Sequence, residues 1–167
     1  LSNDLKIINI SDPTAPLLEG SLVVGDNPRD VSIADNYAYV VDSNSDDLKI
    51  VDVSDPNNPT LLSSLGIGSL PVKVVASNNY AYIIESNLFD GSNENLKVID
   101  VSDPATPTLA ASLDAGDSNT SVDLLGNYLY ITSQSGSKLS IVEIGCSAVT
   151  IGIDPLSGEI VTSEDGD

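Results

Sequence analysis

Two short segments recur along this chain, and this internal repeat constrains the fold more than any other feature. The first segment begins at Leu5, Leu48 and Leu96 and reads LKIINISDPTAPLLEGSL, LKIVDVSDPNNPTLLSSL and LKVIDVSDPATPTLAASL; a shorter copy, LSIVEIG, begins at Leu139. These starts are 43, 48 and 43 residues apart. The second segment lies between the copies and reads DVSIADNYAYVVDS, VKVVASNNYAYIIES and SVDLLGNYLYITS. Self-similarity at this period predicts a protein built from one repeated structural unit.

Each unit contains four short segments of the kind that form β-strands. In the unit 29–65 the apolar runs and their turns predict strands over 31–34, 37–41, 48–53 and 60–65. Four antiparallel strands in every repeat predict an all-β fold, a β-propeller with four-stranded blades. The chain has room for about 13 such strands up to Ile144, or three to four blades, whereas closed propellers have about four to eight. We therefore expect part of a larger ring, whose ends do not pair with each other and are covered by the rest of a parent chain or by another subunit.

The repeats resemble LVIVD repeats, a family of bacterial and archaeal surface proteins. The resemblance rests on one motif, a strand followed by Ser-Asp-Pro, with the copies IINISDP from Ile7, IVDVSDP from Ile50 and VIDVSDP from Val98. It covers about residues 5–145 and implies a propeller in an exported, multidomain protein without defined catalytic residues. We accordingly divide the chain into propeller blades over 1–145 and a tail over 146–167. The tail is similar to the opening of Calx-beta-like domains, and Asp154–Gly158 reads as a turn between two short apolar runs.

Charge and residue usage exclude several classes of function. The 167 residues include 25 Asp and Glu but only six Lys and Arg, for a formal net charge of −19, which argues against binding nucleic acid. The chain has no His and a single cysteine, Cys146, so it cannot supply a Ser-His-Asp triad, a zinc cluster or an internal disulfide. Cys146 reads as a buried free thiol or as a partner for a cysteine outside this sequence. No apolar run reaches the roughly 18 residues of a membrane span, so we expect no membrane insertion.

Two sets of repeated side chains have structural explanations. Asp in the Ser-Asp-Pro turn can bond its own backbone and start a tight turn, and its identical use in every unit favours architecture over a binding site. The tyrosines lie two residues apart on the second strand of each unit, so both members of a pair share one face and are expected to have substantially buried rings. The aspartates are Asp12, Asp55 and Asp103, and the tyrosines are Tyr37, Tyr39, Tyr80, Tyr82, Tyr128 and Tyr130.

Two acidic patterns are candidates for chemistry. Asp42, Glu85 and Ser133 occupy equivalent places at the end of the second strand, and a pair of carboxylates is what a glycosidase requires. The loop that starts at Asp42 also alternates oxygen-bearing side chains, which suits calcium, and its candidate ligands are Asp42, Asn44 and Asp46. This loop departs from the EF-hand, because Asp47 stands where that motif has Gly and Val53 where it has Glu. A solvated acidic loop is the competing interpretation.

Two functions follow as alternatives. The first is a non-catalytic, extracellular propeller that needs no cofactor and contacts other proteins in a cell-surface or filamentous assembly. The second is a hydrolase or lyase that uses acidic residues, with or without calcium. A concave pocket on which Asp42, Glu85 and Ser133 converge would favour the enzyme.

Overall fold

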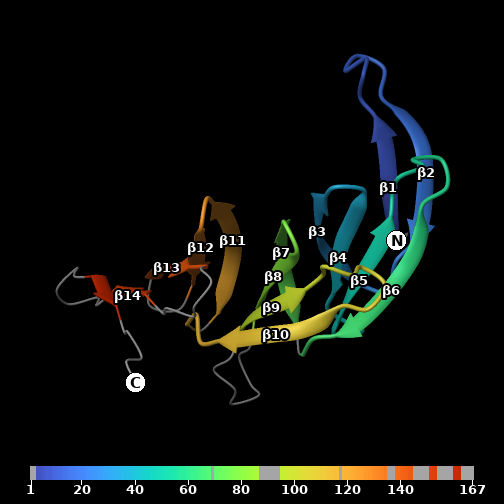
Figure 1. The fold of residues 1–167 in the computed structure, drawn as a ribbon. Helices are drawn as coiled ribbons and strands as arrows, with labels where there is room; N and C mark the ends of the chain where they lie inside the picture. The colour runs from blue at the N-terminus through green and yellow to red at the C-terminus, as the bar shows by residue number, and fades with distance from the viewer. Residues whose placement is uncertain are drawn as a thin grey trace.

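The computed structural model describes residues 3–68, 70–86, 95–116, 118–134, 138–144, 151–153 and 160–162 (Figure 1). These residues form β-strands and contain no helix, so none of them belongs to a helix able to cross a membrane. The first six strands are β1 (Asp4–Asn9), β2 (Leu17–Val23), β3 (Pro28–Ala34), β4 (Tyr37–Asp42), β5 (Asp47–Asp52) and β6 (Thr60–Gly66). The next four are β7 (Pro71–Ser77), β8 (Tyr80–Glu85), β9 (Leu96–Asp100) and β10 (Thr108–Leu113). The last five are β11 (Asn119–Leu125), β12 (Tyr128–Ser133), β13 (Lys138–Glu143), β14 (Ile151–Ile153) and β15 (Ile160–Thr162).

Two complete four-stranded antiparallel blades confirm the predicted repeat unit. Their strand orders are β3-β4-β5-β6 and β7-β8-β9-β10. The predicted strands of the unit 29–65 match β3 to β6 to within one residue at each end, except that β3 begins three residues earlier, at Pro28. The hairpin between the first two strands of a blade turns through a residue with positive φ in each of three units: 51° at Asp35, 53° at Asn78 and 60° at Gly126. Asp, Asn and Gly tolerate this conformation best, which is why local sequence suffices to place the turn.

The remaining sheets are partial blades and a terminal hairpin. Strands β1 and β2 pair at one end, β11, β12 and β13 pair at the other, and β14 pairs with β15. The 13 predicted strands thus correspond to β1 to β13, and the two apolar runs of the tail pair with each other, while the turn predicted at 154–158 and Cys146 lie outside the described residues. The blades form an open arc in Figure 1, and no described strand of the first sheet pairs with one of the third blade, as expected.

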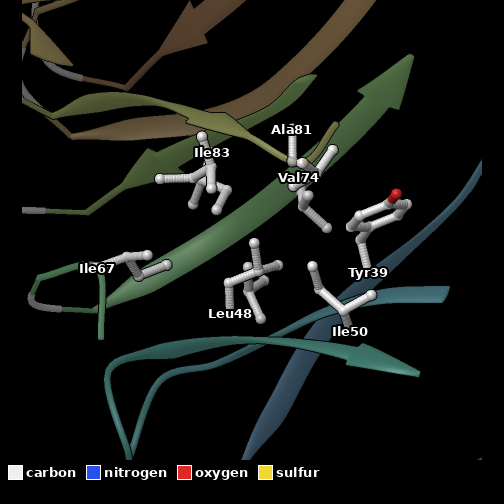
Figure 2. Close-up of a cluster of buried hydrophobic side chains, with 10 residues drawn as sticks. Tyr39, Leu48, Ile50, Ile67, Val74, Ala81 and Ile83 are labelled. Carbon is white, nitrogen blue, oxygen red and sulfur yellow. The ribbon is translucent and has the colours of Figure 1, made fainter. Parts of the chain in front are cut away.

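The core lies between the blades. Tyr39, Leu48 and Ile50, from β4 and β5, pack against Val74 and Ile83 of the next blade (Figure 2). A second cluster repeats this packing one blade further along, from Tyr82 and Leu96 to Leu129 and Ile131. Because both faces of a blade are covered by its neighbours, its second strand is buried on both sides, which explains the runs of Val and Ile in β4 and β8.

The tyrosine prediction is confirmed in part. Tyr39 and Tyr82 are 3% and 5% exposed, and Tyr37 and Tyr130 are partly buried. The prediction is wrong for Tyr80 and Tyr128, which are 39% and 38% exposed. All three first tyrosines follow the hairpin turn directly, but only Tyr37 packs against a core cluster, whereas Tyr80 and Tyr128 belong to none of the described clusters. Sharing a face with a buried tyrosine did not ensure burial.

The outer strand of one blade contacts the Ser-Asp-Pro turn of the next. The Ser63 hydroxyl of β6 donates to the Pro104 carbonyl over 2.7 Å, and a Cβ on Gly20 of β2 would overlap the Pro56 carbonyl. In the turn itself, Asp55 accepts the backbone N–H of Asn57 at 3.0 Å and the side-chain amide of Asn58 at 2.8 Å. The equivalent turns at Asp12 and Asp103 make the same type of side-chain-to-backbone bond. This geometry confirms the structural interpretation of the repeated aspartates.

The Ser63 hydrogen bond gives a first prediction. We expect Ser63→Ala to lower the free energy of unfolding by about 1 kcal/mol, because the Pro104 carbonyl loses its donor at a partly buried site. Urea titration at pH 7 measures the change. The matched control is Ser121→Ala, which makes the same substitution at an exposed position of β11 and should change stability by less than about 0.5 kcal/mol. Equal effects of the two substitutions would contradict a stabilising inter-blade hydrogen bond.

Candidate functional site

The three positions singled out at the ends of the second strands are structurally equivalent. Each faces the first residue of the innermost strand across the sheet, in the pairs Pro28–Asp42, Pro71–Glu85 and Asn119–Ser133. Asp42 and Glu85 are 0% and 1% exposed, so neither carboxylate is a solvated acid at the surface.

Asp42 holds together the chain segments around it. One carboxylate oxygen, Oδ2, accepts the backbone N–H of Asn27 at 2.9 Å, and the other, Oδ1, accepts those of Asn44 at 2.8 Å and Ser45 at 3.1 Å. Burial acts to raise the pKa of Asp42, but the hydrogen bonds from backbone N–H groups outweigh it and lower the pKa to about 2. The side chain is therefore an ionised cap that joins the entry to β3 with the β4–β5 loop.

A glycine packs against each buried acid. Gly25 and Gly68 precede the innermost strands β3 and β7 with φ of 145° and 127°, and a Cβ on either would overlap the carboxylate of Asp42 or Glu85. In the third blade the smaller Ser133 replaces the acid, and a Cβ on Gly116 would meet nothing within 4 Å. The acid and the glycine thus form a matched pair where the chain crosses between blades. Sequence analysis missed this pairing, although the Gly recurs three residues before the start of each innermost strand.

The paired-carboxylate interpretation receives no support from this arrangement. Asp42 and Glu85 lie in different blades, both are buried, and neither lines the larger of the two clefts described at the inner ends of the blades. A general acid and base must reach substrate, and Asp42 has both oxygens engaged by backbone donors.

The candidate calcium ligands Asp42 and Asp46 have other hydrogen-bond partners in this structure. Asp42 points its oxygens at backbone N–H groups, Asp46 accepts the backbone N–H of Leu70 at 2.8 Å, and Asn44 is exposed. Nowhere in the described part of the chain do three or more Asp, Glu or Cys side chains gather in a way that would hold a metal ion. Calcium binding stays a prediction from the loop sequence.

A cleft of about 480 Å³ opens where the innermost strands of three blades begin. Each of these strands starts with an irregularity in register, between Pro28 and Asp30, between Pro71 and Lys73, and between Asn119 and Ser121. Such a β-bulge leaves one residue without a partner and redirects its side chain. The three residues at the bulges are Arg29, Val72 and Thr120, and all three line the cleft. The other described residues of the lining are Asn27, Pro28, Lys73, Ser86 and Asn119.

The cleft differs in charge from the rest of the molecule. Two of the six Lys and Arg residues of the chain line it, Arg29 and Lys73, and the described residues of its lining include no Asp or Glu. Lys73 forms an ion pair with Asp30 at 3.1 Å, just outside the lining. The signal that sequence analysis missed is the divergence of the repeat at this point: Pro-Arg-Asp from Pro28, Pro-Val-Lys from Pro71 and Asn-Thr-Ser from Asn119.

Comparison with protein families finds one match along most of the sequence. The LVIVD repeat matches residues 1–24, 25–65, 72–115 and 115–150, so nearly every described blade strand falls within a repeat. No curated protein sequence matches this chain significantly.

Solved structures of propellers share the fold at low sequence identity. Hydrazine synthase from Kuenenia stuttgartiensis has a TM-score of 0.61 at 20% identity, over 86% of this chain and 38% of that one. The computationally designed Ika8 protein has a TM-score of 0.66 at 15% identity, over 99% of this chain and 44% of that one. A chain from a nidogen/laminin complex has a TM-score of 0.59 at 18% identity, over 86% and 52%. The present chain therefore spans about half or less of these structures, and the similarity concerns the fold alone.

Proposed function

The chain belongs to the LVIVD-repeat family, and from this membership and the fold we propose that it is a non-catalytic, extracellular propeller module that contacts other proteins in a cell-surface or filamentous assembly. The observation that carries the proposal is the character of the outer strands of the blades. Strands β6 and β10 are the outer edges of their sheets, and neither contains a charged residue or a proline.

Edge strands without Lys or Pro favour association. An edge strand presents free backbone N–H and C=O groups, and soluble proteins usually protect it with Lys, Pro or a bulge that blocks pairing. The outer strands β2, β6 and β10 each contain a bulge, but none of them contains Lys or Pro. Their equivalent residues Leu18, Leu61 and Leu109 are 52%, 48% and 54% exposed, and Leu17 and Leu62 are exposed beside them. None of the 25 acidic residues of the chain lies on β6 or β10. We assign these edges to contacts with a partner protein, including a second copy of this chain.

Other features agree with a binding role without catalysis. The two buried carboxylates that resembled a catalytic pair act as backbone caps or pack against glycine, and the proposed role needs no cofactor. The charge of −19 disfavours nucleic acid as a partner. One structural neighbour comes from a complex between nidogen and laminin, which supports a propeller that works through protein contacts. The extracellular location rests on the resemblance to LVIVD surface proteins.

The edge contacts are tested by self-association. We expect the 167-residue chain to associate reversibly in sedimentation-velocity runs, and Leu61→Lys with Leu109→Lys to weaken the association at least about tenfold, because a charge on an edge strand opposes pairing. The matched control is Ile33→Lys, which places the same charge at a residue of β3 that is 59% exposed and lies away from the outer edges. A wild-type chain that stays monomeric at all concentrations, or association that only the control weakens, would contradict the proposal.

A further inference from the structure

The cleft at the inner ends of the blades is lined by a buried polar side chain that has no partner among the described residues. Asn119, the first residue of β11, is 2% exposed, and neither its amide nitrogen nor its amide oxygen has a hydrogen-bond partner among the described residues. A buried amide without partners is destabilising, and buried polar groups in native proteins are nearly always paired. Asn119 also lines the cleft, so a bound molecule can supply the missing partners.

The repeat shows that the fold does not require an asparagine here. The equivalent residues of the other two blades are Pro28 and Pro71, each the first residue of its innermost strand and each at the same bulge. The residue before Pro71 is Leu70, with a φ of 54°, and the residue before Asn119 is Ser118, with the same φ of 54°. The chain therefore enters the innermost strand of the third blade with the same φ as in the second blade, where proline follows. The buried amide of Asn119 lowers the stability of the folded chain at a position where the other two blades have proline. This difference points to a role of Asn119 in binding.

The cationic side chains of the cleft indicate which charge the ligand carries. Arg29 is exposed at the bulge of β3 and has no ion pair or hydrogen bond within the described chain segments. Lys73 lies on the neighbouring strand β7, and its amine forms an ion pair with Asp30. A guanidinium group offers two parallel N–H donors that match a carboxylate. None of the described residues that line the cleft is Asp or Glu, so a carboxylate placed there meets no opposing acid from the described part of its walls.

We propose that this cleft binds a small organic acid that also carries hydroxyl groups. Its carboxylate pairs with Arg29, and a hydroxyl group, which both donates and accepts, satisfies the amide oxygen and nitrogen of Asn119. The volume of about 480 Å³ is in the range of sites for small molecules, about 300–1,000 Å³. Thr120 at the third bulge and Asn27 provide further hydrogen-bonding groups in the walls. This site is separate from the outer edges proposed for protein contacts, so either assignment can fail without the other.

The test is titration calorimetry on the 167-residue chain at about 0.1 M salt, where exposed charges are screened beyond about 10 Å. The probes are D-glucuronate, which has a carboxylate and hydroxyl groups, D-glucose, which has only the hydroxyl groups, and acetate, which has only the carboxylate. We expect glucuronate to bind at least about tenfold more tightly than either of the others. Arg29→Ala should reduce glucuronate binding to the level of glucose. Lys97→Ala is the matched control, since it removes one positive charge from β9 outside the cleft and should leave binding unchanged.

The decisive variant is Asn119→Pro, which gives the third blade the residue of the other two. We expect its melting temperature to equal or exceed that of the wild type while glucuronate binding falls at least about tenfold. Asn119→Ala serves as a second variant with the same expected loss of binding, should proline perturb the strand. The proposal is overturned if the wild type binds none of the probes, if glucose or acetate binds as tightly as glucuronate, or if both Asn119 variants bind glucuronate like the wild type. A more stable Asn119→Pro with no binding by the wild type would mean that water alone satisfies the amide.

Discussion

Asp42→Ala is expected to lower the free energy of unfolding by about 3 kcal/mol or more at pH 7. The substitution leaves the backbone N–H groups of Asn27, Asn44 and Ser45 without their acceptor, and hydrogen bonds to a charged group are worth about 1.5–3 kcal/mol each. Urea titration monitored by circular dichroism measures the loss. The matched pair is Asp42→Asn against Asp35→Asn, the same chemical change at a buried and at an exposed residue. We expect Asp35→Asn to change stability by less than about 0.5 kcal/mol.

The pH dependence gives an independent measure of the same cap. The pKa of Asp42 in the folded chain, about 2, lies below the ordinary value of 3.8, so ionised Asp42 stabilises the folded state above pH 3.8. That contribution of roughly 2 kcal/mol is lost as the pH falls from 3.8 through 2, because the unfolded chain takes up the proton first. The stability difference between wild type and Asp42→Asn should therefore shrink over this interval. A difference that stays constant from pH 7 to pH 2 would show that Asp42 does not act as an ionised cap.

Gly25→Ala is expected to destabilise the chain by about 3 kcal/mol, through two separable effects. The backbone at Gly25 has a φ of 145°, which a residue with a side chain adopts only with strain of about 1–3 kcal/mol, and the new Cβ would overlap the Asp42 carboxylate. The same urea titration measures the total. Since the overlap displaces the cap, the losses in Gly25→Ala and Asp42→Ala should add up to more than the loss in the double variant.

Two other glycines separate strain from overlap. Gly116 has a φ of 97° but open space around its Cβ position, so Gly116→Ala should show the strain alone, about 1–2 kcal/mol. Gly66 ends β6 without a positive φ and also has open space, so Gly66→Ala should be neutral or slightly stabilising. If Gly25→Ala proves no more damaging than Gly116→Ala, the close packing of glycine on Asp42 is not a stabilising feature of the blade junction.

The sequence by itself determined the blades. Strand alternation, the Asp35-Asn36 turn and the Asp55-Pro56 turn are decided by the residues within a few positions, so one repeat read in isolation predicts its four strands. The copies then support each other, because the same pattern of strands and turns fits three segments that differ in their individual residues. The number of strands, their antiparallel pairing and the structural role of Asp55 all follow from this local information.

Only the tertiary structure decided which side chains are available for chemistry. One oxygen of Asp42 accepts the N–H of Asn27, 15 residues earlier, and Asp46 accepts the N–H of Leu70, 24 residues later, and the loop sequence alone indicates neither bond. The cleft gathers Arg29, Lys73 and Asn119 from three blades, and no local pattern connects them. Turn and strand formation depend on neighbours in the chain, whereas burial, charge environment and unmet hydrogen bonds depend on neighbours in space.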